Sequence, residues 1–278
     1  MEPERAGGRR DLAVAARVAV ETMRLIQLAS CLLALTSFSE RGMAASNLRP
    51  APVGAPGNAP REYTRFEEPE LTMGFMRLAF GSDMQRLGGG EDRLHRFDHR
   101  VRFHISNTGR VDRSEMYKRV LDDFVLRVPR IDASVVDAST PPDVIVRLVD
   151  SKDFMRTLVA ALGNSTAQTF ILQTHPRCTT RSRTDEKGLI LRADIFIVVD
   201  QGNDTFLDCA YHETLHAFGL MNHADDVPWT TLNQNRSVGY LSVYDRAMLQ
   251  MLYDPRLQAG MTRSEVQVLL PAVIRELR

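Results

Sequence analysis

Residues 208–223 read DCAYHETLHAFGLMNH and limit what this chain can fold into more than any other stretch. His212 and His216 are four residues apart, and Glu213 follows the first histidine. Residues four apart on a helix lie one turn above each other, so both imidazoles can bind one metal ion. The glutamate can then take a proton from a water molecule on that ion. Gly219 favours a left-handed helix end, which would turn the chain back toward the metal.

The same stretch has the apolar periodicity of a helix that packs against a core. At about 100° per residue, its large apolar side chains fall on one side, and the two histidines lie together on the adjacent flank. These apolar residues are Leu207, Tyr211, Leu215 and Phe218. A β-branched run over 189–199 comes before the helix, so the sequence predicts a strand followed by a metal-binding helix.

Four further segments show regular patterns. Apolar residues at helical spacing predict helices over 70–80 and 115–128. Alternation over 99–105 and a β-branched run over 143–149 predict two more strands. With the strand over 189–199, the order strand, helix, strand, strand, helix is typical of a layered α/β or α+β fold.

The amino terminus has the pattern of a targeting segment. Met23 and Arg24 give a short basic start, and residues 25–38 form an apolar stretch too short to span a bilayer. Small residues follow, up to Ala45. We therefore expect residues 1–45 to act as a secretory signal, with translation starting at Met23, cleavage near Ala45, and export to the periplasm or cell envelope.

Two alternatives exist for this segment. Leu28 to Cys31 resembles the site at which bacterial lipoproteins are lipidated, and lipid on Cys31 would anchor the protein to a membrane. The apolar run continues past Cys31, where a mature lipoprotein is already polar, which favours a cleaved signal. The other alternative is a buried amphipathic helix over 25–38, which would be retained in the mature protein.

After the signal, residues 46–60 are rich in proline and alanine and predict an extended linker. We expect one folded domain over 61–278. The whole chain carries 35 Lys+Arg and 35 Asp+Glu, so it has no net charge at pH 7. No basic block of the nucleic-acid-binding type is present, and we expect no nucleic-acid partner.

Cleavage near Ala45 would leave two cysteines, Cys178 and Cys209. An even cysteine count in an exported protein indicates a disulfide, because the compartments outside the cytosol are oxidising. The sequence therefore predicts a bond between Cys178 and Cys209.

The spacing around the two histidines resembles the metzincin zinc peptidases, whose pattern is H-E-x-x-H-x-x-G-x-x-H/D. His212, Glu213, His216 and Gly219 match its first four positions. Asn222 occupies the position of the third ligand, and His223 follows it. We expect His223 to be the third ligand, with Asn222, Asp225 and Asp226 as the alternatives. No methionine occurs between Met221 and Met248, so the methionine turn of the metzincins is either missing or replaced by another apolar residue such as Leu232.

This resemblance implies a metzincin-like mixed sheet with a zinc-binding helix and a C-terminal helical part. It also implies a zinc-dependent peptidase that acts on a peptide or protein substrate through a water bound to Zn²⁺, with Glu213 as general base. Tyr240 or Tyr244 could stabilise the oxyanion. Residues 241–253 resemble the helix that closes the domain in matrixin-like members.

A broader resemblance covers nearly the whole mature chain. Stretches within 70–83, 209–222 and 252–262 resemble an uncharacterised family of bacterial envelope proteins, a domain of unknown function whose members are commonly described as lipoproteins. This family implies no activity, so the rival hypothesis is a non-catalytic binding or structural protein on a degenerate peptidase scaffold. A gluzincin with Glu265 or Glu276 as third ligand is the weaker alternative, since Gly219 belongs to the shorter metzincin turn.

Overall fold

The computed structural model describes residues 64–81, 92–163 and 177–277, all of which lie in one compact unit, Pro60–Arg278. The expected signal over 1–45, with Cys31, and the linker over 46–60 lie outside the described residues. Among the helices of the described part, none combines the length and the apolar character needed to cross a membrane.

The core of the fold is a five-stranded sheet in the order β2-β1-β3-β5-β4. Its strands are β1 (Val101–Asn107), β2 (Ala133–Val135), β3 (Val144–Val149), β4 (Cys178–Thr184) and β5 (Ile190–Val198). The pairs β1–β2, β1–β3 and β3–β5 are parallel, and the edge strand β4 runs antiparallel to β5. The sheet is therefore mixed, and the α/β class expected from the sequence is confirmed.

Six helices accompany this sheet in the described residues. They are α2 (Glu68–Ala79), α3 (Ser114–Arg127), α4 (Ser151–Leu162), α6 (Asn203–Ala217), α7 (Val243–Leu252) and α8 (Arg263–Leu277). The helices and strands expected from periodicity are all present, with their ends shifted by a few residues. Five elements come in addition: α7, which the resemblance over 241–253 indicated, and β2, β4, α4 and α8.

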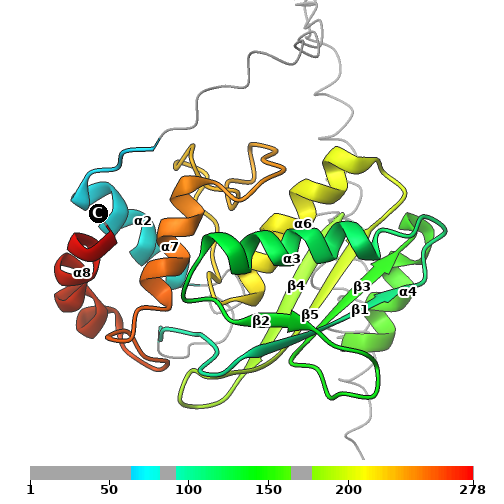
Figure 1. The fold of residues 1–278 in the computed structure, drawn as a ribbon, viewed down its shortest axis with the longest axis horizontal. Coiled ribbons are helices and arrows are strands. Elements are labelled where there is room, and N and C mark those ends of the chain that lie inside the picture. The colour runs from blue at the N-terminus through cyan, green and yellow to red at the C-terminus, as the bar shows by residue number, and fades with distance from the viewer. Residues whose placement is uncertain (1–63, 82–91, 164–176, 278) are drawn as a thin grey trace, which may run out of the picture. The chain divides into compact units, whose positions relative to one another are not determined.

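The two faces of the sheet carry different helices, because successive side chains of a strand point in opposite directions. In β5, Ile195 and Ile197 join the main core with α3 and α6. Phe196 and Val198 point the other way and form a smaller core with Phe154 of α4. Figure 1 shows α3 and α6 lying together and α4 at the other side of the strands. The histidine-bearing helix α6 thus lies on the α3 side of the sheet.

Helices α2, α7 and α8 pack against one another beside the sheet (Figure 1). One close approach depends on a glycine: a Cβ at Gly74 of α2 would lie 1.5 Å from the hydroxyl oxygen of Tyr244 in α7. The Tyr244 side chain is 1% exposed, and its ring meets that of Phe66 edge to face. Gly74 therefore makes the room in which Tyr244 packs.

The turn after α7 is held by a buried carboxylate. The Asp254 side chain is 0% exposed and accepts hydrogen bonds from Arg256 and from Arg130, with a 2.6 Å contact to the latter. The Arg256 guanidinium holds the pKa of Asp254 at about 2, below its usual value. Arg96 donates to the carbonyls of Leu252 and Leu257 in the same turn. These bonds fix the C-terminal helices to the sheet domain.

Candidate metal centre

Three histidine rings converge beside α6. The distance between the Nε2 atoms of His212 and His216 is 3.1 Å, that between His212 and His223 is 3.1 Å, and that between His216 and His223 is 3.2 Å. A tetrahedral zinc ion with bonds of about 2.0–2.1 Å holds neighbouring ligand atoms about 3.3–3.4 Å apart. In the described part of the chain, this is the one group of three or more His, Cys, Asp or Glu residues placed for a metal.

The hydrogen bonds of the other ring nitrogens decide which nitrogen carries the proton. The Nδ1 atom of His212 lies 2.9 Å from the carbonyl oxygen of Thr231, and that of His216 lies 2.6 Å from the carbonyl oxygen of Leu220. A carbonyl oxygen can only accept, so each Nδ1 carries the hydrogen and each Nε2 of the neutral ring presents a lone pair. Two such lone pairs at 3.1 Å repel each other, and a cation between them removes the repulsion.

Burial keeps both rings in this neutral form. It is the main cause that lowers the pKa of His212 to about 4, and the charge of a protonated His223 contributes to the same shift. Burial also lowers the pKa of His216 well below its usual value. Neutral imidazoles are the form in which histidine binds a metal.

A buried network supports the carbonyl that orients His212. The Asp245 carboxylate accepts from the backbone N–H of Thr231 at 2.9 Å and from its hydroxyl at 2.6 Å. It also accepts from the hydroxyls of Thr230 and Ser242. Burial raises the pKa of Asp245, and these hydrogen bonds oppose that shift. Asp245 thus holds the loop whose carbonyl fixes the ring of His212.

Gly219 returns the chain from α6 toward the histidines. Its φ is +115°, and a Cβ there would lie 2.2 Å from the carbonyl oxygen of His95. Only glycine tolerates both the conformation and the close approach. The turn expected at the end of the helix is present, and it brings His223 back to His212 and His216.

Glu213 is buried beside this cluster. Its side chain is 4% exposed, and its Oε2 has no hydrogen-bond partner among the described residues. Burial raises the pKa of Glu213 to about 8, and the charge of Asp208 adds to the shift. A buried carboxylate oxygen without a donor is costly, so this oxygen is suited to a ligand or water that brings a proton.

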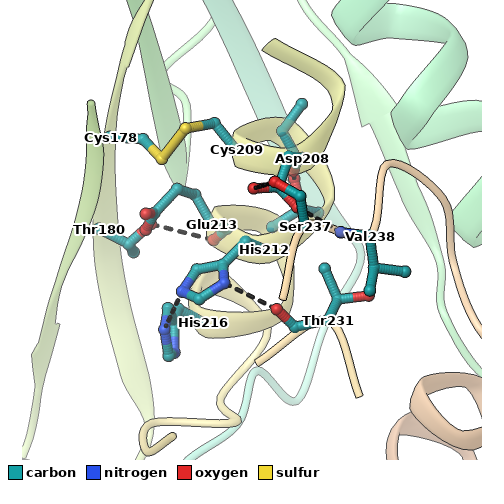
Figure 2. Close-up of a disulfide and its surroundings, with 12 residues drawn as sticks. Cys178, Thr180, Asp208, Cys209, His212, Glu213, His216, Thr231, Ser237 and Val238 are labelled. Atoms are coloured by element: carbon teal, nitrogen blue, oxygen red, sulfur yellow. Dashed lines mark hydrogen bonds between the residues drawn. A yellow bond between two sulfur atoms is a disulfide. The ribbon is translucent and has the colours of Figure 1, made fainter. Parts of the chain in front are cut away.

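The predicted disulfide between Cys178 and Cys209 is confirmed. It joins the edge strand β4 to α6, with a Cα–Cα distance of 5.8 Å (Figure 2). On the same face of β4, the Thr180 hydroxyl donates to the backbone carbonyl of Glu213 at 3.0 Å. The edge strand is therefore attached to the helix on both sides of the first histidine.

The loop before α7 is attached to α6 as well. Asp208 accepts from the backbone N–H of Val238 at 2.6 Å and from the hydroxyl of Ser237 at 2.9 Å (Figure 2). No local sequence pattern predicts this contact or the roles of Thr231 and Asp245. The Ser-x-x-Asp pattern at Ser242 is a signal for a helix start, but it does not say what else the aspartate holds.

The other candidate ligands have partners elsewhere. Asn222 donates to the carbonyl of Arg77, and Asp226 pairs with the Arg77 guanidinium. Asp225 accepts from the backbone N–H of Gln234. Glu265 bonds Thr262 at the start of α8, and Glu276 pairs with Arg256. Leu232, the possible replacement for the methionine of the metzincin turn, is fully buried in the main core.

The two tyrosines differ in position. The hydroxyl of Tyr244 lies on α2, next to Gly74 and 3.5 Å from the carbonyl of Glu70, so the structure gives it a packing role. The side chain of Tyr240 is 47% exposed, and its carbonyl accepts from the Thr231 hydroxyl. Tyr240 thus contacts the loop that supports His212, whereas the hydroxyl of Tyr244 packs between α7 and α2.

Comparison with known proteins agrees with the uncharacterised family expected from the sequence. Residues 68–272 match the family described as "Protein of unknown function (DUF2927)", and this range contains α6 and all three histidines. Comparison with curated proteins gave no match. Because the match covers well over half of the chain, the protein belongs to the DUF2927 family.

Proposed function

We propose that this protein is an exported zinc-dependent peptidase. One observation carries the proposal: three histidine Nε2 atoms lie within 3.2 Å of one another, and the residue after the first histidine is a buried glutamate whose Oε2 lacks a partner in the described structure. The H-E-x-x-H-x-x-G spacing, which resembles that of the metzincins, supports it, with the third ligand moved by one residue to His223.

The residues have separate roles in this proposal. His212, His216 and His223 hold the ion through their Nε2 atoms. Zinc, when bound, supplies a Lewis acid that polarises a peptide carbonyl and makes water a stronger acid. Glu213 acts in its ionised form, which a cation bound by the neighbouring histidines favours. It accepts a proton from the attacking water and passes it to the nitrogen of the leaving amine. Tyr240, next to the supporting loop, is the candidate donor to the oxyanion.

Export to the periplasm or cell envelope is part of the proposal. The signal-like segment over 1–45 supports it, and so does the disulfide between β4 and α6, since such bonds persist in oxidising compartments. The substrate is a peptide or protein of that compartment. Whether Cys31 carries a lipid decides only whether the enzyme is anchored to the membrane.

The first experiment measures metal content by mass spectrometry in the purified protein and in a His212→Ala/His216→Ala variant. About one zinc per chain in the parent and none in the variant is the expected result. A His99→Ala/His104→Ala variant is the matched control, because these histidines lie outside the cluster and their loss should leave the zinc content unchanged. No zinc in the parent after purification with added zinc would refute the site.

The second experiment tests catalysis. The zinc-loaded protein is incubated with a mixed peptide library, and cleavage products are identified by mass spectrometry. Glu213→Gln should keep the zinc and lose the cleavage, since an amide cannot accept the proton. Cleavage that survives in Glu213→Gln would refute the mechanism. Zinc without cleavage in the parent would instead favour the non-catalytic envelope protein.

A further inference from the structure

A second site is suggested by the sheet face opposite to the histidines. Beyond α4, the side chains on this face become charged: Arg147 of β3, Arg181 and Arg183 of β4, and Arg192 and Asp194 of β5. The strand register places Arg181 opposite Asp194 and Arg147 opposite Phe196, so these side chains share the face that α4 covers. With Ala161 and Leu162 at the end of α4, they line a pocket of about 340 Å³.

The pocket has an excess of positive charge. Asp194 pairs with Arg147 and with Arg192, so one carboxylate faces four guanidinium groups. The guanidinium groups of Arg181 and Arg183 make no hydrogen bond or ion pair with any described residue. The sequence between α4 and β4, residues 164–176, contains no Asp or Glu that could neutralise them. Among the described residues, about three positive charges of the pocket are therefore left without a counter-charge.

The strand pairing places two of these positive charges next to each other. Arg183 lies directly opposite Arg192 on the neighbouring antiparallel strand. Like charges in such a cross-strand position destabilise a sheet. Asp194 draws Arg192 to one side through a 3.2 Å contact, but Arg183 keeps no counter-charge among the residues that the structure describes. A bound anion between the two arginines would turn this repulsion into attraction.

We propose that this arginine pocket binds a small ligand that carries phosphate groups. Guanidinium groups from three strands suit the several oxygens of a phosphate, because each guanidinium can donate two parallel N–H···O hydrogen bonds to two of these oxygens. A ligand with a single carboxylate group would compensate only one of the three remaining positive charges. The ligand should therefore carry at least two negative charges. The pocket volume is that of a small ligand site. The proposal does not depend on the peptidase function, since the histidines belong to the opposite face.

The test uses pyrophosphate as probe, with isothermal titration calorimetry on the purified protein at low ionic strength. We expect one pyrophosphate per chain and an at least 10-fold weaker affinity in an Arg181→Gln/Arg183→Gln variant. An Arg119→Gln/Arg275→Gln variant removes the same charge from α3 and α8 and should bind like the parent. Equal losses in the two variants would show a net-charge effect only, and no binding by the parent would overturn the proposal as well.

A second arm distinguishes a free ligand from a lipid headgroup. Vesicles containing phosphatidylglycerol are sedimented with the protein, with and without pyrophosphate. Binding to vesicles that is lost in the Arg181→Gln/Arg183→Gln variant and competed by pyrophosphate assigns the headgroup as the source of the phosphate. Binding of pyrophosphate without vesicle binding assigns a soluble phosphorylated ligand. Vesicle binding that both variants keep, together with no pyrophosphate binding, would refute the pocket.

One substitution tests the like-charge argument directly. Arg183→Glu places an opposite charge across from Arg192, so the midpoint of urea unfolding should rise while pyrophosphate affinity falls at least 10-fold. A higher urea midpoint together with a lower affinity is expected if Arg183 repels Arg192 in the free protein and contacts the anion in the complex. A midpoint that falls together with the affinity would contradict this explanation.

Discussion

Loss of the disulfide between Cys178 and Cys209 should have a large and calculable effect on stability. The two cysteines are separated by 31 residues in the sequence. Closing a loop of this length removes about 12 cal/mol/K of entropy from the unfolded chain, which corresponds to about 3.7 kcal/mol at 25 °C. A Cys178→Ala/Cys209→Ala variant should therefore lose about 3.7 kcal/mol of unfolding free energy. Domains have about 5–15 kcal/mol in total, so the loss is a large share.

Urea unfolding followed by circular dichroism measures this difference. With a slope of about 2 kcal/mol per M, the midpoint should fall by about 1.8 M. The parent protein kept in a reducing agent should match the double variant, because both lack the cross-link. Either single alanine variant should fall equally far, since one substitution already removes the bond.

A loss below about 1 kcal/mol in both the double variant and the reduced parent would contradict the loop-closure estimate. It would mean that the segment between the two cysteines is already compact in the unfolded chain. A reduced parent that stays stable while the double variant does not would instead assign the effect to packing of Cys209, which is 4% exposed.

Three further outcomes follow from particular contacts. Asp245→Asn should weaken zinc binding about 10–100-fold in a chelator competition titration, because a donor amide group replaces one of the two acceptor oxygens that hold the loop orienting the first ligand. The Asp254 carboxyl has a pKa lowered from 3.8 to about 2, so its contribution of about 2.4 kcal/mol is present above pH 4 and is lost as the pH falls toward 2. Urea midpoints between pH 5 and pH 2 should show this loss in the parent and a smaller one in Asp254→Asn. Gly74→Ala should cost about 1–3 kcal/mol by thermal unfolding, and adding Tyr244→Phe should recover part of it, since the hydroxyl is the nearest atom to the new Cβ. Additive effects of these last two substitutions would contradict the contact.

Regular patterns made much of the fold predictable. The buried strands β3 and β5 are runs of β-branched residues, and α3 buries its apolar positions as the periodicity indicates. Strand β4 was not predictable in this way, because its sequence CTTRSRT has no apolar alternation. An edge strand with polar side chains on both faces gives no such signal. Its pairing with β5 in the structure identifies this segment as a strand.

The candidate metal centre was predictable in part, because three of its residues follow a local pattern. His212, Glu213 and His216 lie within one turn of one helix, so their proximity follows from local geometry. The return of His223 depends on the turn at Gly219, which the sequence also indicates. Support of His212 by Asp245 depends on how α7 packs against the loop at Thr231, and no local pattern contains that information. The packing of Tyr244 on Gly74 is a long-range contact of the same kind.

The polar sequence of β4 has a physical explanation in its two faces. Cys178 and Thr180 point toward α6, where one forms the disulfide and the other donates to the carbonyl of Glu213. Arg181 and Arg183 point the opposite way and line the arginine pocket. If Cys178 and Thr180 were apolar, the strand would no longer be attached to the histidine-bearing helix. If Arg181 and Arg183 were apolar, the pocket would have less positive charge. The edge strand is therefore polar on both faces because one face attaches it to the histidine-bearing helix and the other lines the proposed anion site.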